Sequence, residues 1–184
     1  MNLAAIVLAA GSSTRFGSNK LYAMLEGAPL VHHAIRAARA APVGNVIVVA
    51  RDGLDIGDWP GEPEVRRIAI ESEALSVSLK AGVATAQGVD GAFVFLGDMP
   101  RVPHEVADQL AAMLGDNYAA LPRCNGRTGH PVLLSARSFA DVATLSGDSG
   151  AGGLLKARDD ITYLDCDDPG VLLDVDRPED LEEI

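Results

Sequence analysis

The residue types best suited to chemistry gather near the N-terminus, where residues 8–20 read LAAGSSTRFGSNK. Small residues let backbone N–H groups approach an anion closely, and Arg15 and Lys20 add positive charge. Lysine is otherwise scarce, because it recurs only at Lys80 and Lys156. The segment is therefore a candidate phosphate-binding loop, the alternative being a solvated surface loop with two cations.

Two familiar phosphate motifs do not fit this segment. The pattern G-x-x-x-x-G-K-[ST] would need a second glycine at position 16, where Phe16 stands, and the segment contains no G-x-G-x-x-G. These mismatches exclude the P-loop and the dinucleotide-binding loop.

Two aspartates are candidate ligands for a hard metal ion. Asp98 follows the apolar run 92–96 in L-G-D-M-P, and a carboxylate at a strand end beside a glycine suits Mg²⁺. Its alternative role is that of a turn aspartate near a proline. Asp176 stands in D-V-D-R-P-E-D-L, where Glu179 follows at the spacing of a helix-capping box. A capping residue whose side chain faces a cleft can also bind metal, so both interpretations of Asp176 stay open.

The first half of the chain alternates between strand-like and helix-like patterns. The apolar runs predict strands, whereas the spacing of apolar residues between them predicts helices, the second of which Ser76 could cap. The strands are expected at 3–8, 45–50, 65–70 and 92–96, and the helices at 29–40, 76–87 and 103–114. This order predicts an α/β three-layer sandwich with a mostly parallel, Rossmann-like sheet. Ligands bind such sheets outside the carboxyl ends of the strands, where the 8–20 segment and Asp98 would lie.

The second half is less regular. Strands at 118–121 and 131–134, joined by a polar turn, predict a small antiparallel hairpin insertion. Further elements are expected as short helices at 136–145 and 151–158, strands at 161–164 and 171–175, and a final helix at 178–184. Because no repeat or linker interrupts the pattern, we expect residues 1–184 to form a single domain.

Charge and cysteine usage narrow the class of protein. The 184 residues include 15 Lys and Arg against 26 Asp and Glu, a formal net charge of −11. Such acidity disfavours binding to nucleic acid or to an anionic membrane, and a phosphate ligand would need local cations or a metal. Cys124 and Cys166 lack metal-motif spacing, which predicts free thiols. With neither a signal peptide nor a bilayer-length apolar run, we expect a cytoplasmic protein.

The pattern L-A-A-G-x-S-x-R-x-G-x-x-K resembles the signature of the MobA-like nucleotidyltransferases, and within them that of the molybdenum cofactor cytidylyltransferases. The resemblance implies the nucleotide-diphospho-sugar transferase type of fold, with the signature loop wrapped around an NTP triphosphate. Arg15 and Lys20 would neutralise phosphate, and Ala10 favours CTP over GTP. The remaining nucleotide contacts implied in this loop are Leu8, Ala9, Gly11, Ser12 and Ser13.

Other segments resemble the same family. The G-D-M-P block identifies Asp98 with the family's metal-binding strand end, and the block around Asp176 resembles its C-terminal D-[IV]-D-T-P-E-D. Ser76 and Ser78 lie in a segment similar to the family's nucleotide-facing helix start. Residues 129–132 resemble its G-H-P-V turn, which would face the acceptor. Residues 147–152 resemble G-D-x-G-A-R, but Gly152 replaces the arginine that would help hold a pterin phosphate.

The resemblance implies a Mg²⁺-dependent enzyme that moves an NMP, CMP from CTP, onto the terminal phosphate of molybdopterin and releases pyrophosphate. Arg15, Lys20 and Asp98 would be catalytic, and Asp98 and Asp176 would bind the metal. Because the attacking phosphate is already an anion, no general base is needed. Two alternatives remain: transfer to a sugar phosphate or another small phosphorylated metabolite, and a non-catalytic chaperone that hands nucleotide or cofactor to a partner molybdoenzyme.

Overall fold

The main sheet runs through the whole molecule, in a computed structural model that describes residues 1–11, 16, 19–156, 158–182 and 184. Its strands lie in the order β10-β7-β9-β6-β1-β4-β5, and β8 pairs with β7. Their bounds are β1 (Leu3–Ala9), β4 (Asn45–Arg51), β5 (Glu64–Ile70), β6 (Gly91–Leu96), β7 (Ala119–Cys124), β8 (Arg127–Thr128), β9 (Val132–Ser135) and β10 (Ile161–Asp165). The pairs β1–β4, β1–β6, β4–β5 and β7–β10 are parallel, which confirms the predicted mostly parallel sheet.

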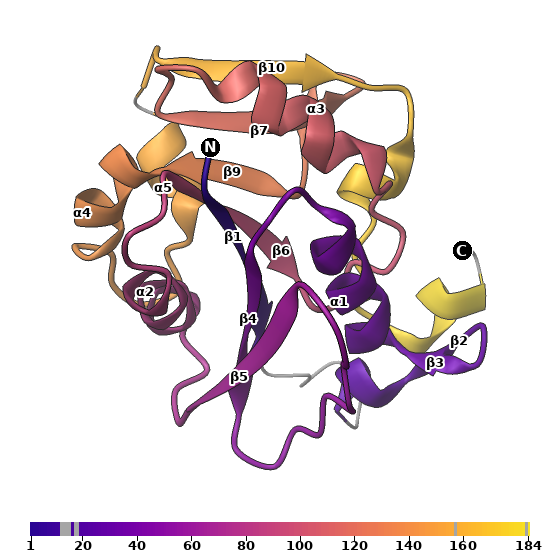
Figure 1. Cartoon of the computed structure of the whole chain (residues 1–184). Helices are drawn as coiled ribbons and strands as arrows, with labels where there is room; N and C mark the ends of the chain where they lie inside the picture. The colour runs from indigo at the N-terminus through magenta and orange to yellow at the C-terminus, as the bar shows by residue number, and fades with distance from the viewer. Residues whose placement is uncertain (12–15, 17–18, 157, 183) are drawn as a thin grey trace.

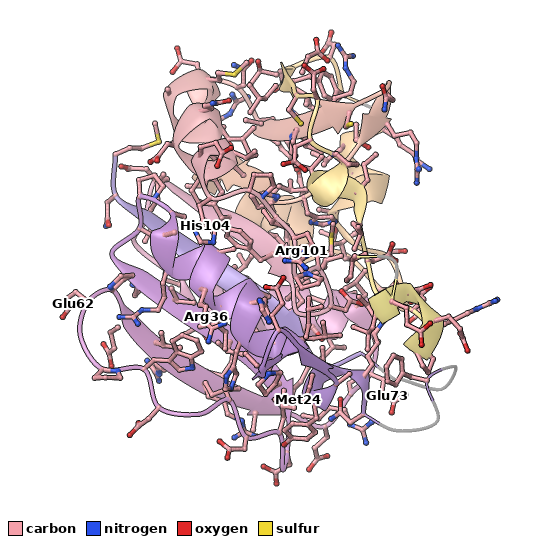
Figure 2. The ribbon with its side chains drawn as sticks, turned by 90° about the vertical axis from the view of Figure 1, so that its right-hand side faces the viewer. Met24, Arg36, Glu62, Glu73, Arg101 and His104 are labelled. Atoms are coloured by element: carbon pink, nitrogen blue, oxygen red, sulfur yellow. The ribbon has the colours of Figure 1, made fainter. Side chains whose placement is uncertain are left out.

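Helices cover both faces of this sheet (Figure 1). On one face lie α1 (Leu30–Ala40) and α3 (Glu105–Leu114), and on the other lie α2 (Leu75–Thr85), α4 (Phe139–Val142) and α5 (Ala151–Leu155). Figure 2 shows α1 lying across the sheet, with Arg36 labelled on it. The predicted three-layer sandwich is therefore confirmed.

Strand β1 shows why a continuous apolar run was needed at this position. Its seven residues are all buried. Because successive side chains of a strand point to opposite faces, Ala5 and Val7 lie in the core layer on the side of α1 and α3, whereas Ala4 and Ile6 lie in the layer on the side of α2. If polar and apolar residues alternated in β1, one face of the strand would be polar and could not pack against the helices that cover it.

The antiparallel pair predicted in the second half is confirmed, with Ala119 opposite Leu134 and Ala120 opposite Leu133. It lies within the main sheet, because β9 is inserted between β6 and β7. A further small antiparallel sheet joins β2 (Met24–Leu25) to β3 (Ala28–Pro29).

The predicted strand at 171–175 is wrong. The segment instead begins with η3, a 3-10 helix at Pro169–Leu172, in which Asp168 Oδ1 accepts a hydrogen bond from the Gly170 amide at 2.7 Å. The apolar run looks strand-like, but the backbone is held by tertiary contacts: the His130 amide donates to the Val171 carbonyl at 2.8 Å. The final helix is likewise a short 3-10 helix, η4, at Pro178–Glu182.

Two helix boundaries also differ from the prediction. Helix α2 begins at Leu75 with Ala74 as its N-cap, so Ser76 is inside the helix and does not cap it. The Ser76 amide donates to the Gly147 carbonyl at 3.2 Å, which supplies a backbone acceptor in place of a side-chain cap. The region predicted as one helix at 136–145 is divided into η2 (Ala136–Ser138) and α4. Among the helices of the described chain, none has the length and apolarity of a membrane span.

Gly129 allows two backbone segments to lie in contact. A Cβ added there would lie 2.1 Å from the carbonyl oxygen of Val171, a distance that requires the backbone to move. We expect Gly129→Ala to lower the free energy of unfolding by about 3 kcal/mol, measured by urea denaturation. Gly153→Ala is the matched control, because a Cβ at that position meets no atom within 4 Å. Equal stability of the two variants would contradict the expectation.

Candidate active site

A cleft of about 570 Å³ lies at the carboxyl ends of the parallel neighbours β1 and β6. It is the position at which open α/β sheets bind ligands. The described residues of its lining are Leu8, Ala9, Ala10, Gly11, Lys20, Leu21, Glu73, Leu75, Ser78, Leu96, Asp98, Asp148 and Asp176. The cleft therefore brings together segments from the beginning, middle and end of the sequence.

The end of β1 forms one wall. The predicted nucleotide contacts Leu8, Ala9, Ala10 and Gly11 all line the cleft. The Gly97 amide donates to the Leu8 carbonyl at 2.9 Å, so the end of β6 is fixed beside the end of β1. The other predicted contacts of this loop, Ser12, Ser13 and Arg15, lie outside the described residues.

Lys20 forms ion pairs with both predicted metal ligands. Its Nζ lies 2.7 Å from Asp98 Oδ2 and 3.1 Å from Asp176 Oδ1. The Lys20 side chain is only 12% exposed. The structure thus places the predicted catalytic lysine and both predicted metal-binding aspartates in one ionic cluster.

Backbone hydrogen bonds hold the two aspartates near each other. The Val175 amide donates to the Asp98 carbonyl at 3.0 Å, which attaches the C-terminal segment to the end of β6. The amides of Asp176 and Arg177 both donate to Asp180 Oδ2 at 2.7 Å. These two hydrogen bonds lower the pKa of Asp180. The predicted capping box paired Asp176 with Glu179, but the carboxylate that accepts from these amides is that of Asp180, three residues after Arg177.

The ionisation of Lys20 follows from its neighbours. Burial by itself would lower the pKa of Lys20, but attraction to Asp98 and hydrogen bonds to Asp98 and Asp176 offset this effect. The pKa of Lys20 therefore lies above its ordinary value. The ammonium stays charged at neutral pH and is suited to neutralising an anion.

The described lining is strongly acidic. It holds four carboxylates, those of Glu73, Asp98, Asp148 and Asp176, and Lys20 is the one basic side chain in this part of it. Glu73, labelled in Figure 2, also forms an ion pair with Arg51. The described side chains alone would therefore repel a polyphosphate, which needs further positive charge to bind in this cleft.

The two predicted serines of α2 have different positions. Ser78 lines the cleft, and its hydroxyl donates to the Ala74 carbonyl at 3.4 Å. Ser76 is buried but is not among the described lining residues, because two positions along a helix turn the side chain through more than half a revolution. The sequence reasoning missed Glu73 and Asp148. Asp148 carried a signal, since it belongs to the G-D-S-G block of residues 147–150.

A second pocket of about 180 Å³ adjoins the first and shares Leu8, Leu75 and Leu96 with it. Its further lining is mostly apolar and includes His130 and Gly152, from the two segments that resemble acceptor-facing motifs. Burial lowers the pKa of His130, so the imidazole is kept neutral. A Cβ at Gly152 would meet no atom within 4 Å, so this wall of the pocket has space.

In the described part of the chain, no three His, Cys, Asp or Glu residues cluster as a metal site. Asp98 and Asp176, which share the Lys20 ammonium, are the candidate ligands for a divalent metal ion in this cleft. Mg²⁺ is commonly bound in this way, by one or two carboxylates together with substrate phosphates and water.

The mostly parallel sheet with a cleft at the end of its first strand agrees with a nucleotidyltransferase, and the family comparison places the chain in that class. Residues 5–161 match the MobA-like NTP transferase domain, and the chain belongs to this family. The family predicted from the sequence is thereby confirmed.

Sequence relatives differ in their described roles. The chain is 29% identical to the purine catabolism protein PucB of Bacillus subtilis (strain 168), over 98% of this chain and 94% of PucB. It is 24% identical to the molybdenum cofactor cytidylyltransferase of Escherichia coli (strain K12), over 95% of this chain and 91% of that enzyme.

Solved structures show the same fold. The crystal structure of Rv0371c from Mycobacterium tuberculosis H37Rv has a TM-score of 0.86 at 22% identity, covering 100% of this chain and 97% of Rv0371c. The structure of the Rv0371c complex with manganese has a TM-score of 0.82. At this identity the likeness concerns the fold alone.

Proposed function

We propose that the protein transfers CMP from CTP onto the terminal phosphate of molybdopterin and releases pyrophosphate. The observation that carries this proposal is the cluster of Lys20, Asp98 and Asp176 in the cleft at the end of β1. The likeness to the E. coli molybdenum cofactor cytidylyltransferase supports the acceptor and the nucleotide. Ala10 supports CTP over GTP.

In this proposal the NTP occupies the larger cleft. The backbone of residues 8–11 contacts the base and sugar, together with Ser12, Ser13 and Ser78. Lys20 and Arg15 neutralise the phosphates, since an acidic cleft needs local positive charge to accept a triphosphate. Ser76 contributes by holding the start of α2 against residue Gly147 and not by touching the nucleotide.

Asp98 and Asp176 are the residues that would hold Mg²⁺. The fit is supported by their geometry, because their oxygens already share one cation, the Lys20 ammonium. When bound, the metal ion supplies positive charge that stabilises the triphosphate and the pyrophosphate leaving group. The manganese complex of Rv0371c supports a divalent ion in this fold.

The chain's own residues act by positioning and by charge neutralisation. An oxygen of the acceptor phosphate forms a bond to the α-phosphorus of the NTP. The bond between that phosphorus and the oxygen that bridges it to the β-phosphorus breaks. The electron pair leaves with pyrophosphate. The nucleophile is already an anion, so none of the described residues has to accept a proton.

The second pocket is the proposed position of the acceptor, because it adjoins the NTP cleft and contains the G-H-P-V turn. The product would pass to a partner molybdoenzyme in the cytoplasm. Gly152 in place of an arginine favours one second candidate: transfer to a sugar phosphate or another small phosphorylated metabolite that needs no cation at this wall.

The decisive experiment measures pyrophosphate release by the purified protein with Mg²⁺ and each of the four common NTPs, with and without molybdopterin. Release that requires both CTP and molybdopterin is the expected result. Faster release with GTP would reject the nucleotide, and release with a sugar phosphate but not with molybdopterin would reject the acceptor. Nucleotide binding by calorimetry without any release would favour the non-catalytic chaperone.

A further inference from the structure

The ammonium of Lys20 lies between Asp98 and Asp176, the two carboxylates that are the candidate metal ligands. It is 2.7 Å from one carboxylate and 3.1 Å from the other. Mg²⁺ binds oxygen at about 2.0–2.1 Å, so the carboxylates must draw closer around a metal than around the ammonium. An ammonium and a divalent cation bound to the same two carboxylates would repel each other strongly at such short range, so the two compete for this position.

The lysine is held in this position by the backbone as well as by charge. Asn19 Oδ1 accepts from the Leu21 amide at 3.2 Å, and the Lys20 carbonyl accepts from the Ala23 amide at 2.9 Å. The backbone of Lys20 is therefore fixed, and the ammonium can leave only by rotation of its side chain. Leaving breaks the charge-assisted hydrogen bonds to Asp98 and Asp176, among the contacts of the described residues, and such bonds are stronger than neutral ones.

A triphosphate in the adjoining cleft would give the ammonium new anionic partners. The departure of Lys20 from the two carboxylates is then compensated, and the carboxylates become available to the metal. Without nucleotide, the metal must displace the ammonium before a triphosphate is present to receive it.

We propose that Lys20 occupies the metal position until a nucleotide arrives, so that the divalent metal and the NTP each strengthen the binding of the other. This inference rests on the proposed function, because it takes Asp98 and Asp176 as the metal ligands. The coupling is reciprocal by thermodynamic necessity. The protein then has a low affinity for metal when no nucleotide is bound, and metal and nucleotide occupy the site together when the nucleotide is present.

The test is a titration with Mn²⁺ alone, with free Mn²⁺ measured by electron paramagnetic resonance and no nucleotide present. Lys20→Met removes the competing ammonium, and we expect it to bind Mn²⁺ about tenfold more tightly than the wild type. Lys80→Met is the matched control, because it lowers the net charge equally and Lys80 is not among the described lining residues. An affinity of Lys20→Met no higher than that of Lys80→Met would overturn the proposal.

A second measurement uses the wild-type protein and does not depend on the folding of a variant. The chain contains three lysines, Lys20, Lys80 and Lys156, so ¹⁵N-lysine labelling gives few ammonium signals to assign. Mg²⁺ alone should leave the Lys20 signal in place, whereas Mg²⁺ with CTP should shift it. A shift of equal size with Mg²⁺ alone would overturn the proposal.

The two readouts separate this inference from the proposed transfer reaction. Tighter Mn²⁺ binding by Lys20→Met in a protein that releases no pyrophosphate would support the role of Lys20 and reject the reaction. The opposite result is pyrophosphate release by the wild type together with equal Mn²⁺ affinities of the wild type and Lys20→Met. That result would support the reaction and reject the role of Lys20.

Discussion

Replacing Asp98 by asparagine is expected to slow pyrophosphate release by about two to three orders of magnitude, a loss typical of removing one charged group from an active site. The amide keeps the size of the side chain but loses the negative charge. It thereby weakens both the proposed Mg²⁺ site and the 2.7 Å ion pair with Lys20. The fold should persist, because the Asp98 carbonyl still accepts the hydrogen bond from the Val175 amide.

Initial rates at saturating CTP and Mg²⁺ measure this loss, and thermal unfolding checks the fold. Asp116→Asn is the matched control: it removes the same charge from an exposed residue near the amino end of β7, at the opposite edge of the sheet from the cleft. A rate for Asp98→Asn close to that of Asp116→Asn would show that Asp98 is not a catalytic residue.

Replacing Lys20 by methionine is expected to lower kcat by a similar factor, about 10²–10³-fold. Methionine fills much of the same space but cannot neutralise the phosphates. The ammonium is the one basic group among the described residues of the cleft lining, so no other described side chain there would replace it. Saturating Mg²⁺ should not restore the rate.

The measurement is single-turnover transfer with excess enzyme, with Lys80→Met as the control for lost charge. Turnover and Mn²⁺ affinity should move in opposite directions in Lys20→Met. If the variant kept wild-type turnover, Lys20 would have no role in catalysis, and its function would be limited to the ion pairs with Asp98 and Asp176 in the nucleotide-free protein.

The sheet was predictable because its central strands are buried on both faces. The run LAAIVLA of β1 has no polar residue, and β6 is similar, so few alternatives to a buried parallel strand exist. The position of the cleft then follows from the fold, because the end of β1 and Asp98 lie at the same edge. Leu8, Ala9, Ala10 and Gly11 were accessible to sequence reasoning for this reason.

The rest of the site depends on tertiary contacts that no local pattern encodes. Asp176 stands 156 residues after Lys20, and it reaches the cleft because the Val175 amide bonds to the Asp98 carbonyl. Residues 171–175 have the composition of a strand, yet the segment begins inside the 3-10 helix Pro169–Leu172, where Val171 lies against Gly129 and Gly170 against Arg101. Ser76 and Ser78 look equivalent in sequence, but the start of α2 at Leu75 turns only Ser78 toward the cleft.

The attachment of the C-terminal segment to the end of β6 also orders events during synthesis. The strands of the main sheet, from β1 to β10, precede Asp176 along the chain. A nascent polypeptide that has emerged from the ribosome through β10 therefore contains all strands of the main sheet but lacks Asp176, one of the two carboxylates around Lys20. The ionic cluster of Lys20, Asp98 and Asp176 can therefore be completed only after the last strand of the main sheet has been synthesised.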